Sequence, residues 1–297
     1  MHLVLGTRGS ALARAQSTWV ADKLRACGHA VDLRIIETRG DREQHKPVPE
    51  LGGKGLFTAE LEEALREGSI HLAVHSLKDL PTEDADGLTV AAVPARESWQ
   101  DILVTPEGHA LAALPEGARI GTASRRRRAL LLSERPDLRI EPLRGNVDTR
   151  IRKALEGEFD GVVLAAAGVA RLGREAPPHT PLPILPAPAQ GALGIQAVVA
   201  AGPVHEALAV LHDERTARAV VAERTLLRTL EGGCSTPVGA LAVERESALH
   251  LEAAVATLDG ACVIHAQADG EDPRALGEAV AARLFELGAQ EILDAQS

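Results

Sequence analysis

Short apolar runs alternate with segments of helical periodicity along the first two-thirds of the chain. Compact apolar runs are typical of buried strands, and apolar residues spaced three and four apart predict amphipathic helices. Such an alternation indicates an α/β sheet in which most strands run parallel. The first series predicts a strand at 3–6, a helix at 10–26, a strand at 31–37, a helix at 57–67 and a strand at 70–74.

A second series of the same kind begins after residues 94–100. Six prolines in residues 176–190 predict an extended crossover, after which 191–199 predicts a strand that returns to the first series. The chain is therefore expected to form two lobes joined by two crossing segments. The second series predicts strands at 101–105, 118–121, 138–142 and 160–165, and helices at 124–134 and 147–156.

The last third of the chain has a different pattern. A helix over 213–230 is followed by three strand-like runs and a helix at 272–287, which predicts a smaller α+β domain. The polar stretch 41–55 has little periodicity and predicts a mobile loop. The expected divisions are a first lobe at 1–95 and 190–212, a second lobe at 98–187, and a C-terminal domain at 214–297.

The two predicted lobes begin with similar sequences. Gly-Thr-Arg-Gly-Ser at 6–10 and Gly-Thr-Ala-Ser-Arg at 121–125 each follow an apolar strand and precede a helix. The first turn of such a helix offers free N–H groups to an anion. The likeness extends to Arg39 and Arg144, each of which precedes a glycine after a later β-like run. Both lobes are therefore predicted to present cations to a negatively charged ligand.

Composition narrows the classes of function. The 297 residues carry a formal net charge of −10, which argues against a nucleic-acid partner because a general binder needs a basic face. Aromatic residues make up 2% of the chain, so an aliphatic core is expected. The three cysteines are too scattered to predict disulfides or a metal site.

The same sequence gives expectations for location and assembly. No apolar run approaches the ~20 residues of a membrane span, and residues 1–20 lack the pattern of a signal peptide. A cytoplasmic protein without a membrane partner is expected. No long exposed apolar stripe demands a protein partner, so a monomer is expected.

The motif His-Ser-Leu-Lys-Asp-Leu-Pro at 75–81 directly follows the predicted strand 70–74. Ligands of open α/β sheets bind at this carboxyl end of the strands. Asp79 beside Lys78 can act there as a general acid and base, and can stabilise a developing cation. The same spacing also fits a solvated turn with a surface ion pair.

Other cations lie in a glycine-rich stretch, at a predicted helix start and after predicted strand ends. Lys54 lies in a glycine-rich stretch without the residues of a P-loop, and fits either a loop that closes over an anion or a solvated hairpin. At most two of the four arginines at 125–128 can face one direction of a helix, where they can grip carboxylates; nucleic acid is the alternative ligand. Arg144, Arg150 and Arg171 follow further strand ends. Together these cations predict a polyanionic ligand in a cleft between the lobes.

Cys234 follows two glycines on a loop between the helix 213–230 and the last domain. Glycines let other groups approach closely, so this thiol can serve as a nucleophile or as an attachment point. A small buried hydrophobic residue is the structural alternative. The sequence supplies no obvious histidine base near Cys234, which favours covalent attachment.

Taken together, these motifs resemble those of the porphobilinogen deaminase, or hydroxymethylbilane synthase, family. The match runs through residues 7–10, 52–57, 75–81, 143–146 and 231–234 in the family's order. The resemblance implies an α/β fold with two periplasmic-binding-protein-like lobes of mixed, mostly parallel sheets, plus a C-terminal α+β domain. It implies a transferase of tetrapyrrole (haem) biosynthesis, which deaminates four porphobilinogen units and couples them head to tail into linear hydroxymethylbilane.

The resemblance also implies the parts of the site. A dipyrromethane cofactor would be joined by a thioether to Cys234, and Asp79 would be the catalytic carboxylate that moves protons and stabilises the cation left when ammonia departs. Cofactor binding is implied for Ser10, Lys78, Asp79, Thr122, Ser124, Arg126, Arg127, Arg144 and Cys234. Substrate binding is implied for Arg8, Ser10, Lys54, Phe57, Arg144, Arg150 and Arg171.

One position departs from the family pattern. Arg125 stands where the family usually has leucine, so Arg126 and Arg127 align as the functional pair, and Arg125 and Arg128 are expected to point elsewhere. A non-enzymatic protein that binds a small dianion between the same two lobes is the alternative reading. Such a protein would carry no covalent adduct and would not need Asp79.

Overall fold

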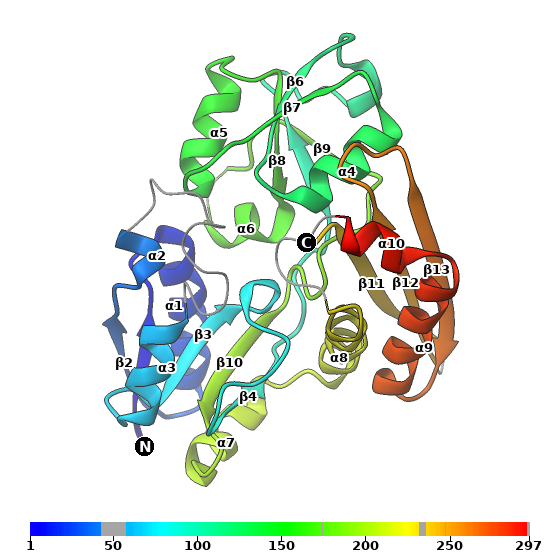
Figure 1. The fold of residues 1–297 in the computed structure, drawn as a ribbon. Helices are drawn as coiled ribbons and strands as arrows, with labels where there is room; N and C mark the ends of the chain where they lie inside the picture. The colour runs from blue at the N-terminus through cyan, green and yellow to red at the C-terminus, as the bar shows by residue number, and fades with distance from the viewer. Residues whose placement is uncertain (43–57, 174, 232–235, 247, 296–297) are drawn as a thin grey trace. The chain divides into compact units, whose positions relative to one another are not determined.

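The computed structural model describes residues 1–42, 58–173, 175–231, 236–246 and 248–295 (Figure 1). The chain divides into two compact units. The first comprises Met1–Arg96 and Ala192–Ala217, and the second comprises Glu97–Gly191 and Arg218–Ser297. The chain therefore leaves the first unit after residue 96 and returns to it after residue 191.

The first unit is built on a five-stranded sheet in the order β2-β1-β3-β10-β4. β1 runs parallel to β2 and β3, whereas β10 runs antiparallel to both of its neighbours, so among these strands it alone is reversed. The strands are β1 (His2–Thr7), β2 (Ala30–Ile35), β3 (Leu72–Ser76), β4 (Leu88–Ala92) and β10 (Leu193–Val198). The helices are α1 (Ala11–Ala26), α2 (Arg39–Arg42), α3 (Ala59–Arg66) and α7 (Gly202–Leu208), with single 3-10 turns η2 (Leu77–Asp79) and η4 (Ala209–Leu211).

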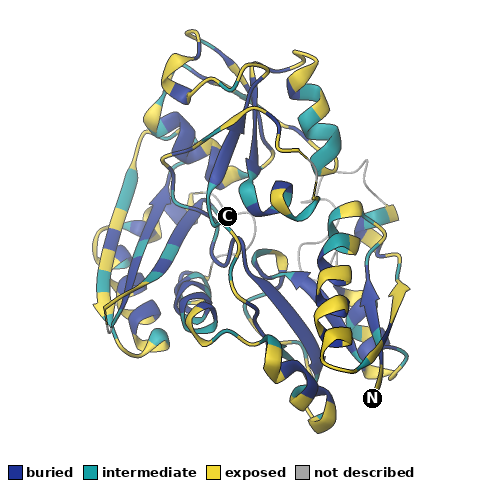
Figure 2. Ribbon diagram, turned by 180° about the vertical axis from the view of Figure 1, so that it is seen from behind, coloured by how far each residue is buried: buried dark blue, intermediate teal, exposed yellow. Residues whose placement is uncertain are grey.

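Successive side chains of this sheet enter two different apolar clusters. On β3, Leu72 and Val74 pack with residues of α1 and α7 on one face. Ala73 packs with residues of α3 on the other. This period of two is a property of strand geometry and explains why the central strands read as continuous apolar runs. In Figure 2 the central strands are buried, and exposed residues lie on the outer surfaces of helices such as α1.

The second unit repeats this sheet. Its order is β7-β6-β8-β5-β9, with β6 parallel to β7 and β8, and with β5 antiparallel to both of its neighbours. Thus β6 and β5 occupy the places that β1 and β10 hold in the first sheet. The strands are β5 (Asp101–Val104), β6 (Arg119–Gly121), β7 (Arg139–Glu141), β8 (Gly161–Ala165) and β9 (His179–Pro181). The helices are α4 (Arg125–Glu134), α5 (Val147–Leu155) and α6 (Ala166–Arg171), with the 3-10 turn η3 (Leu111–Ala113).

A three-stranded antiparallel sheet completes the second unit, in the order β11-β12-β13. On β12, Leu251 and Val255 pack with the helices of this region. Ala254 and Ala256 join the cluster formed by α4 and the five-stranded sheet. The elements are β11 (Val238–Arg245), β12 (Ala248–Ala256), β13 (Val263–Gly270), α8 (Glu214–Thr229), α9 (Pro273–Glu286) and α10 (Ala289–Asp294). The predicted α+β domain is therefore joined to the second lobe through α4.

The predicted fold class is confirmed, and among the described residues the buried hydrophobic core is aliphatic apart from Phe159. The sequence reading missed β4, β9, α6, α7 and α10. α6 follows β8 without any break in the apolar pattern, and β9 lies at a sheet edge, where proline is tolerated. The expectation that 41–55 is a loop is wrong for Asp41 and Arg42, which lie in α2; residues 43–55 lie outside the described residues. The proposed domain boundaries remain predictions.

Candidate active site

Four of the predicted site residues follow two neighbouring strands of the first unit. Arg8 and Ser10 come after β1, and Lys78 and Asp79 come after β3. β1 and β3 are parallel and adjacent, so their carboxyl ends meet at one edge of the sheet. The fold therefore brings these four residues to the same sheet edge.

Asp79 is exposed, whereas Leu77 and Leu80, which lie before and after it in the chain, are buried. It ends the 3-10 turn η2, in which Leu77 is 1% exposed, and Leu80 follows at 5%. The N–H of Leu77 donates to the carbonyl oxygen of Ala192 at 3.0 Å, and the N–H of Leu80 donates to the carbonyl of Leu77 at 3.3 Å. The backbone that carries the Asp79 carboxylate is thus fixed on both sides.

Arg8 is held by a carboxylate that the sequence analysis did not select. Its Nη2 and Nε donate to Asp41 Oδ1 at 2.5 Å and Asp41 Oδ2 at 3.2 Å, while Thr38 Oγ1 donates to Oδ2 at 2.8 Å. Burial raises the pKa of Asp41, but the hydrogen bonds from Arg8 and Thr38 outweigh it, so the pKa lies below its usual value. Asp41 therefore stays ionised and orients the Arg8 guanidinium.

His75 belongs to the core of the first unit. It lies on β3, and burial lowers its pKa to about 4, with Gln196 opposing this shift and the charge of Arg8 adding to it. Its Nε2 has no hydrogen-bond partner among the described residues. A histidine that remains neutral near pH 7 inside the sheet is a structural residue rather than a proton donor.

A serine caps the first helix of each lobe in the same way. Ser10 Oγ accepts from the N–H of Ala13 at 3.3 Å at the start of α1, and Ser124 Oγ accepts from the N–H of Arg127 at 3.3 Å at the start of α4. Such a cap stabilises a helix by about 1 kcal/mol. The N–H of Ser124 in turn donates to Thr122 Oγ1 at 3.2 Å, which stabilises the turn between β6 and α4.

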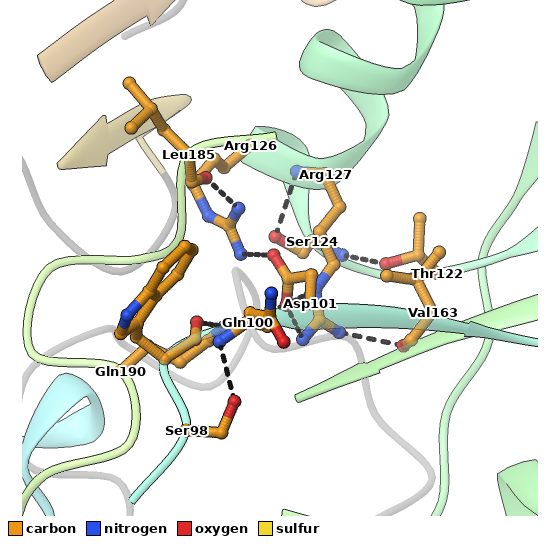
Figure 3. Close-up of polar contacts among 11 residues, drawn as sticks. Ser98, Gln100, Asp101, Thr122, Ser124, Arg126, Arg127, Val163, Leu185 and Gln190 are labelled. Carbon is orange, nitrogen blue, oxygen red and sulfur yellow. Dashed lines mark hydrogen bonds and ion pairs between the residues drawn. The ribbon is translucent and has the colours of Figure 1, made fainter. Parts of the chain in front are cut away.

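The four successive arginines of α4 divide by burial. Arg126 and Arg127 are 4% and 6% exposed, whereas Arg125 and Arg128 are exposed, as the alignment of the arginine pair predicts. Asp101, at the start of β5, is fully buried and lies between the two buried guanidinium groups (Figure 3). Burial lowers the pKa of Arg126, which Asp101 opposes and Arg127 reinforces. These two cations therefore form a buried cluster around one shared carboxylate.

The remaining predicted arginines follow the other parallel strands of this sheet. Arg144 is exposed in the turn after β7. Arg150 Nε donates to the carbonyl of Gly145 at 2.8 Å, and Arg171 Nη2 donates to the carbonyl of Gly191 at 2.7 Å. Burial lowers the pKa of Arg171 from its usual value, and Glu97 opposes the shift. Because β6, β7 and β8 are parallel, the residues that follow them share one sheet edge.

Three predicted site residues, Lys54, Phe57 and Cys234, lie outside the described residues. Within the described ranges, no group of three or more histidine, cysteine, aspartate or glutamate side chains is placed to hold a metal ion. No helix of the described chain is long and apolar enough to span a membrane.

Sequence reasoning missed the counter-ions, Asp101 and Asp41, and the glutamine that supports Asp101. One signal was available: Asp101 opens a strand that is otherwise apolar, Ile102 to Val104. A charged residue in a buried strand predicts a buried partner of opposite charge. Gln190, whose Nε2 donates to Asp101 at 2.9 Å, carries no comparable signal.

The family models and the curated relatives agree on one family. Residues 3–206 match the family model "Porphobilinogen deaminase, dipyromethane cofactor binding domain", and residues 217–286 match "Porphobilinogen deaminase, C-terminal domain". The porphobilinogen deaminase of Rubrobacter xylanophilus is 48% identical over 98% of this chain and 96% of its own length. That of Desulforudis audaxviator is 49% identical over 98% and 97%. Among solved structures, a periplasmic substrate-binding protein of an ABC transporter from Coxiella burnetii superposes with a TM-score of 0.46 at 16% identity, covering 75% of this chain and 96% of that one.

Proposed function

The chain belongs to the porphobilinogen deaminase family, the transferases that assemble hydroxymethylbilane from porphobilinogen in tetrapyrrole biosynthesis, and from this premise we propose which residues carry the reaction. Asp79 is the catalytic carboxylate, and Cys234 carries the dipyrromethane cofactor through a thioether. The observation that carries the first assignment is the setting of Asp79: an exposed carboxylate on a buried, hydrogen-bonded turn at the carboxyl edge of β3. Membership of an enzyme family also removes the reason for the non-enzymatic alternative.

Each of the two sheet edges carries groups that suit the anionic groups of a dipyrromethane. Its acetate and propionate groups are anions, and these edges carry cations and Ser-capped helix starts. Arg126 Nε is a buried N–H without an acceptor among the described residues, which an anionic ligand can supply. When bound, the cofactor supplies the pyrrole carbon from which the chain of substrate units grows. Its proposed direct ligands besides Cys234 are Ser10, Lys78, Asp79, Thr122, Ser124, Arg126 and Arg144, and Arg127 belongs to the same site.

Asp79 performs the proton transfers. A carboxylate at this edge can accept a proton from a pyrrole N–H, and in its acid form can donate one to the departing amine. Once ammonia leaves, the substrate carries a positive charge, which the ionised carboxylate stabilises. The rigid η2 turn keeps the carboxylate in place for both roles.

Cations bind the carboxylates of porphobilinogen. The proposed substrate-binding residues are the cations Arg8, Lys54, Arg144, Arg150 and Arg171, together with Ser10, which offers a hydroxyl, and Phe57, which offers apolar contact. Asp41 fixes the Arg8 guanidinium through two hydrogen bonds, so this cation is oriented before substrate arrives. We further propose that the protein works as a cytoplasmic monomer without nucleic-acid or membrane partners.

Replacement of the carboxylate tests the assignment of Asp79. Asp79→Ala should lower the turnover of porphobilinogen by about 10²–10⁴-fold, the usual contribution of a general acid–base group. The melting temperature should stay close to that of the unmodified protein because the side chain is exposed. Asp86→Ala, which removes another exposed carboxylate from the loop that follows, is the matched control and should keep full activity. Turnover of Asp79→Ala within tenfold of the control would exclude the proposed role.

A further inference from the structure

Asp101 is the centre of a buried polar network that no motif in the sequence identifies. Its Oδ1 accepts hydrogen bonds from Arg127 Nε at 3.1 Å, Arg127 Nη2 at 2.7 Å and Gln190 Nε2 at 2.9 Å. Its Oδ2 lies 2.7 Å from Arg126 Nη2. Figure 3 shows the carboxylate between the two guanidinium groups, with Gln190 on a third side. One carboxylate thus contacts both arginines of the aligned pair.

The two arginines are held differently. Arg127 uses three of its five N–H donors inside the protein, because its Nη1 also donates to the carbonyl of Val163 at 2.9 Å. Arg126 contacts Asp101 through Nη2 and donates from Nη1 to the carbonyl of Leu185 at 2.5 Å. Its Nε is buried and has no partner among the described residues.

The charges of the cluster do not cancel. Two guanidinium groups and one carboxylate leave one net positive charge on side chains that are 4%, 6% and 0% exposed. An uncompensated buried charge is costly, and so is a buried N–H without an acceptor. A single carboxylate from a ligand would neutralise the remaining charge and would also accept a hydrogen bond from Arg126 Nε.

We propose that Asp101 is a positioning residue with two effects. It neutralises the charge of Arg127, which anchors it, and it holds the guanidinium of Arg126 in place. The net positive charge that is left then binds one carboxylate of the dipyrromethane. This inference rests on the proposed function and divides a pair that the family resemblance treats as equivalent. Arg126 is the ligand-binding member. Arg127 reaches the ligand only through its effect on Asp101.

The position of Asp101 in the chain adds to its role. It lies five residues after the chain leaves the first unit, and Gln190 lies two residues before the chain returns. Gln190 Nε2 also donates to the carbonyl of Trp99 at 2.8 Å, so the two crossing segments are tied to each other beside Asp101. Through Asp101 and Gln190, the two arginines are therefore connected to the two chain segments at which their lobe begins and ends.

Charge rescue separates positioning from a merely structural role. Asp101→Asn, Asp101→Asn with Arg127→Gln, and Asp101→Asn with Arg126→Gln are purified from cells that make porphobilinogen. The fraction of folded protein with the dipyrromethane mass is measured for each, together with kcat and KM for porphobilinogen and the melting temperature. Asp137→Asn, which breaks the Arg135–Asp137 pair elsewhere in the same unit, is the control for loss of an ion pair.

The proposal predicts at least a tenfold loss of cofactor-loaded protein, or a tenfold rise in KM, for Asp101→Asn. Adding Arg127→Gln should restore the value to within threefold of the unmodified protein, because it removes the charge that Asp101 neutralised, and the amide oxygen introduced at position 101 can still accept from Arg126. Adding Arg126→Gln should not. Asp101→Asn within twofold of the control, or two double variants that behave alike, would overturn the proposal.

Two further outcomes remain interpretable. If Asp101→Asn fails to fold, the two double variants are compared directly, and the proposal requires the Arg127→Gln double to be the cofactor-loaded one. If the unmodified protein carries no dipyrromethane mass, the proposed function fails instead, and this is seen before any variant is made.

Discussion

Protonation of His75 should make the stability of the first unit depend on pH. Burial holds its pKa at about 4 in the folded protein, against about 6.5 in the unfolded chain. The unfolded state therefore binds more protons between these values, so stability is fully present above pH 6.5 and falls as the pH drops toward 4. At pH 5 the unfolded histidine is protonated about 30 to 1 and the folded one about 1 to 10, a loss of about 2 kcal/mol relative to pH 7. The ceiling, reached below pH 4, is about 3 kcal/mol.

The assay compares unfolding by urea in the unmodified protein and in His75→Gln, which cannot titrate. The chain has two tryptophans, so a Trp99→Phe background leaves Trp19, in α1 of the first unit, as the fluorescent reporter. His75→Gln is expected to be less stable at pH 7, with the difference shrinking by about 2 kcal/mol at pH 5. Parallel pH dependences of the two proteins, or a histidine NMR titration with a midpoint near 6.5, would refute the reasoning.

The remaining predictions concern the cations of the site. Arg144→Leu should lower the efficiency of chain elongation by about 5- to 150-fold, since a ligand carboxylate without its partner costs about 1–3 kcal/mol; full elongation, followed by mass spectrometry of the enzyme with its bound intermediates, would exclude the role. Asp41→Asn should raise KM for porphobilinogen several-fold with kcat little changed, because Arg8 loses its ionic partner; an equal fall in kcat and kcat/KM would contradict this. Arg125→Gln, an exposed neighbour of the buried pair, should leave KM unchanged, and a tenfold rise would show that the pair is misaligned.

Local patterns were enough to predict most of the fold and the strand ends at which the proposed site residues lie. The similar stretches at 6–10 and 121–125 predicted two matching strand–turn–helix units, and both are present, each with a serine that caps its helix. Helical spacing allowed at most two of the four arginines to face one direction, and the family resemblance selected Arg126 and Arg127, which are the two buried members of the run.

The partners of these cations could not be predicted, because they come from distant elements. Asp101 precedes Arg127 by 26 positions and Gln190 follows Asp101 by 89, and only the folded sheet and the crossing segment bring them together. Asp41 was read as part of a polar loop, because a four-residue helix has too little length for periodicity. Long-range pairing of this kind depends on topology rather than on local pattern.

The chain is proposed to be a transferase whose dipyrromethane cofactor, on which the chain of substrate units grows, is bound covalently to Cys234. Intact-mass measurement of the protein, purified from cells with functional haem synthesis, tests it most directly. The account predicts an excess over the sequence mass equal to one dipyrromethane, which disappears in Cys234→Ser while Cys262→Ser retains it. An unmodified mass for the native protein, or an adduct that survives in Cys234→Ser, would contradict the account.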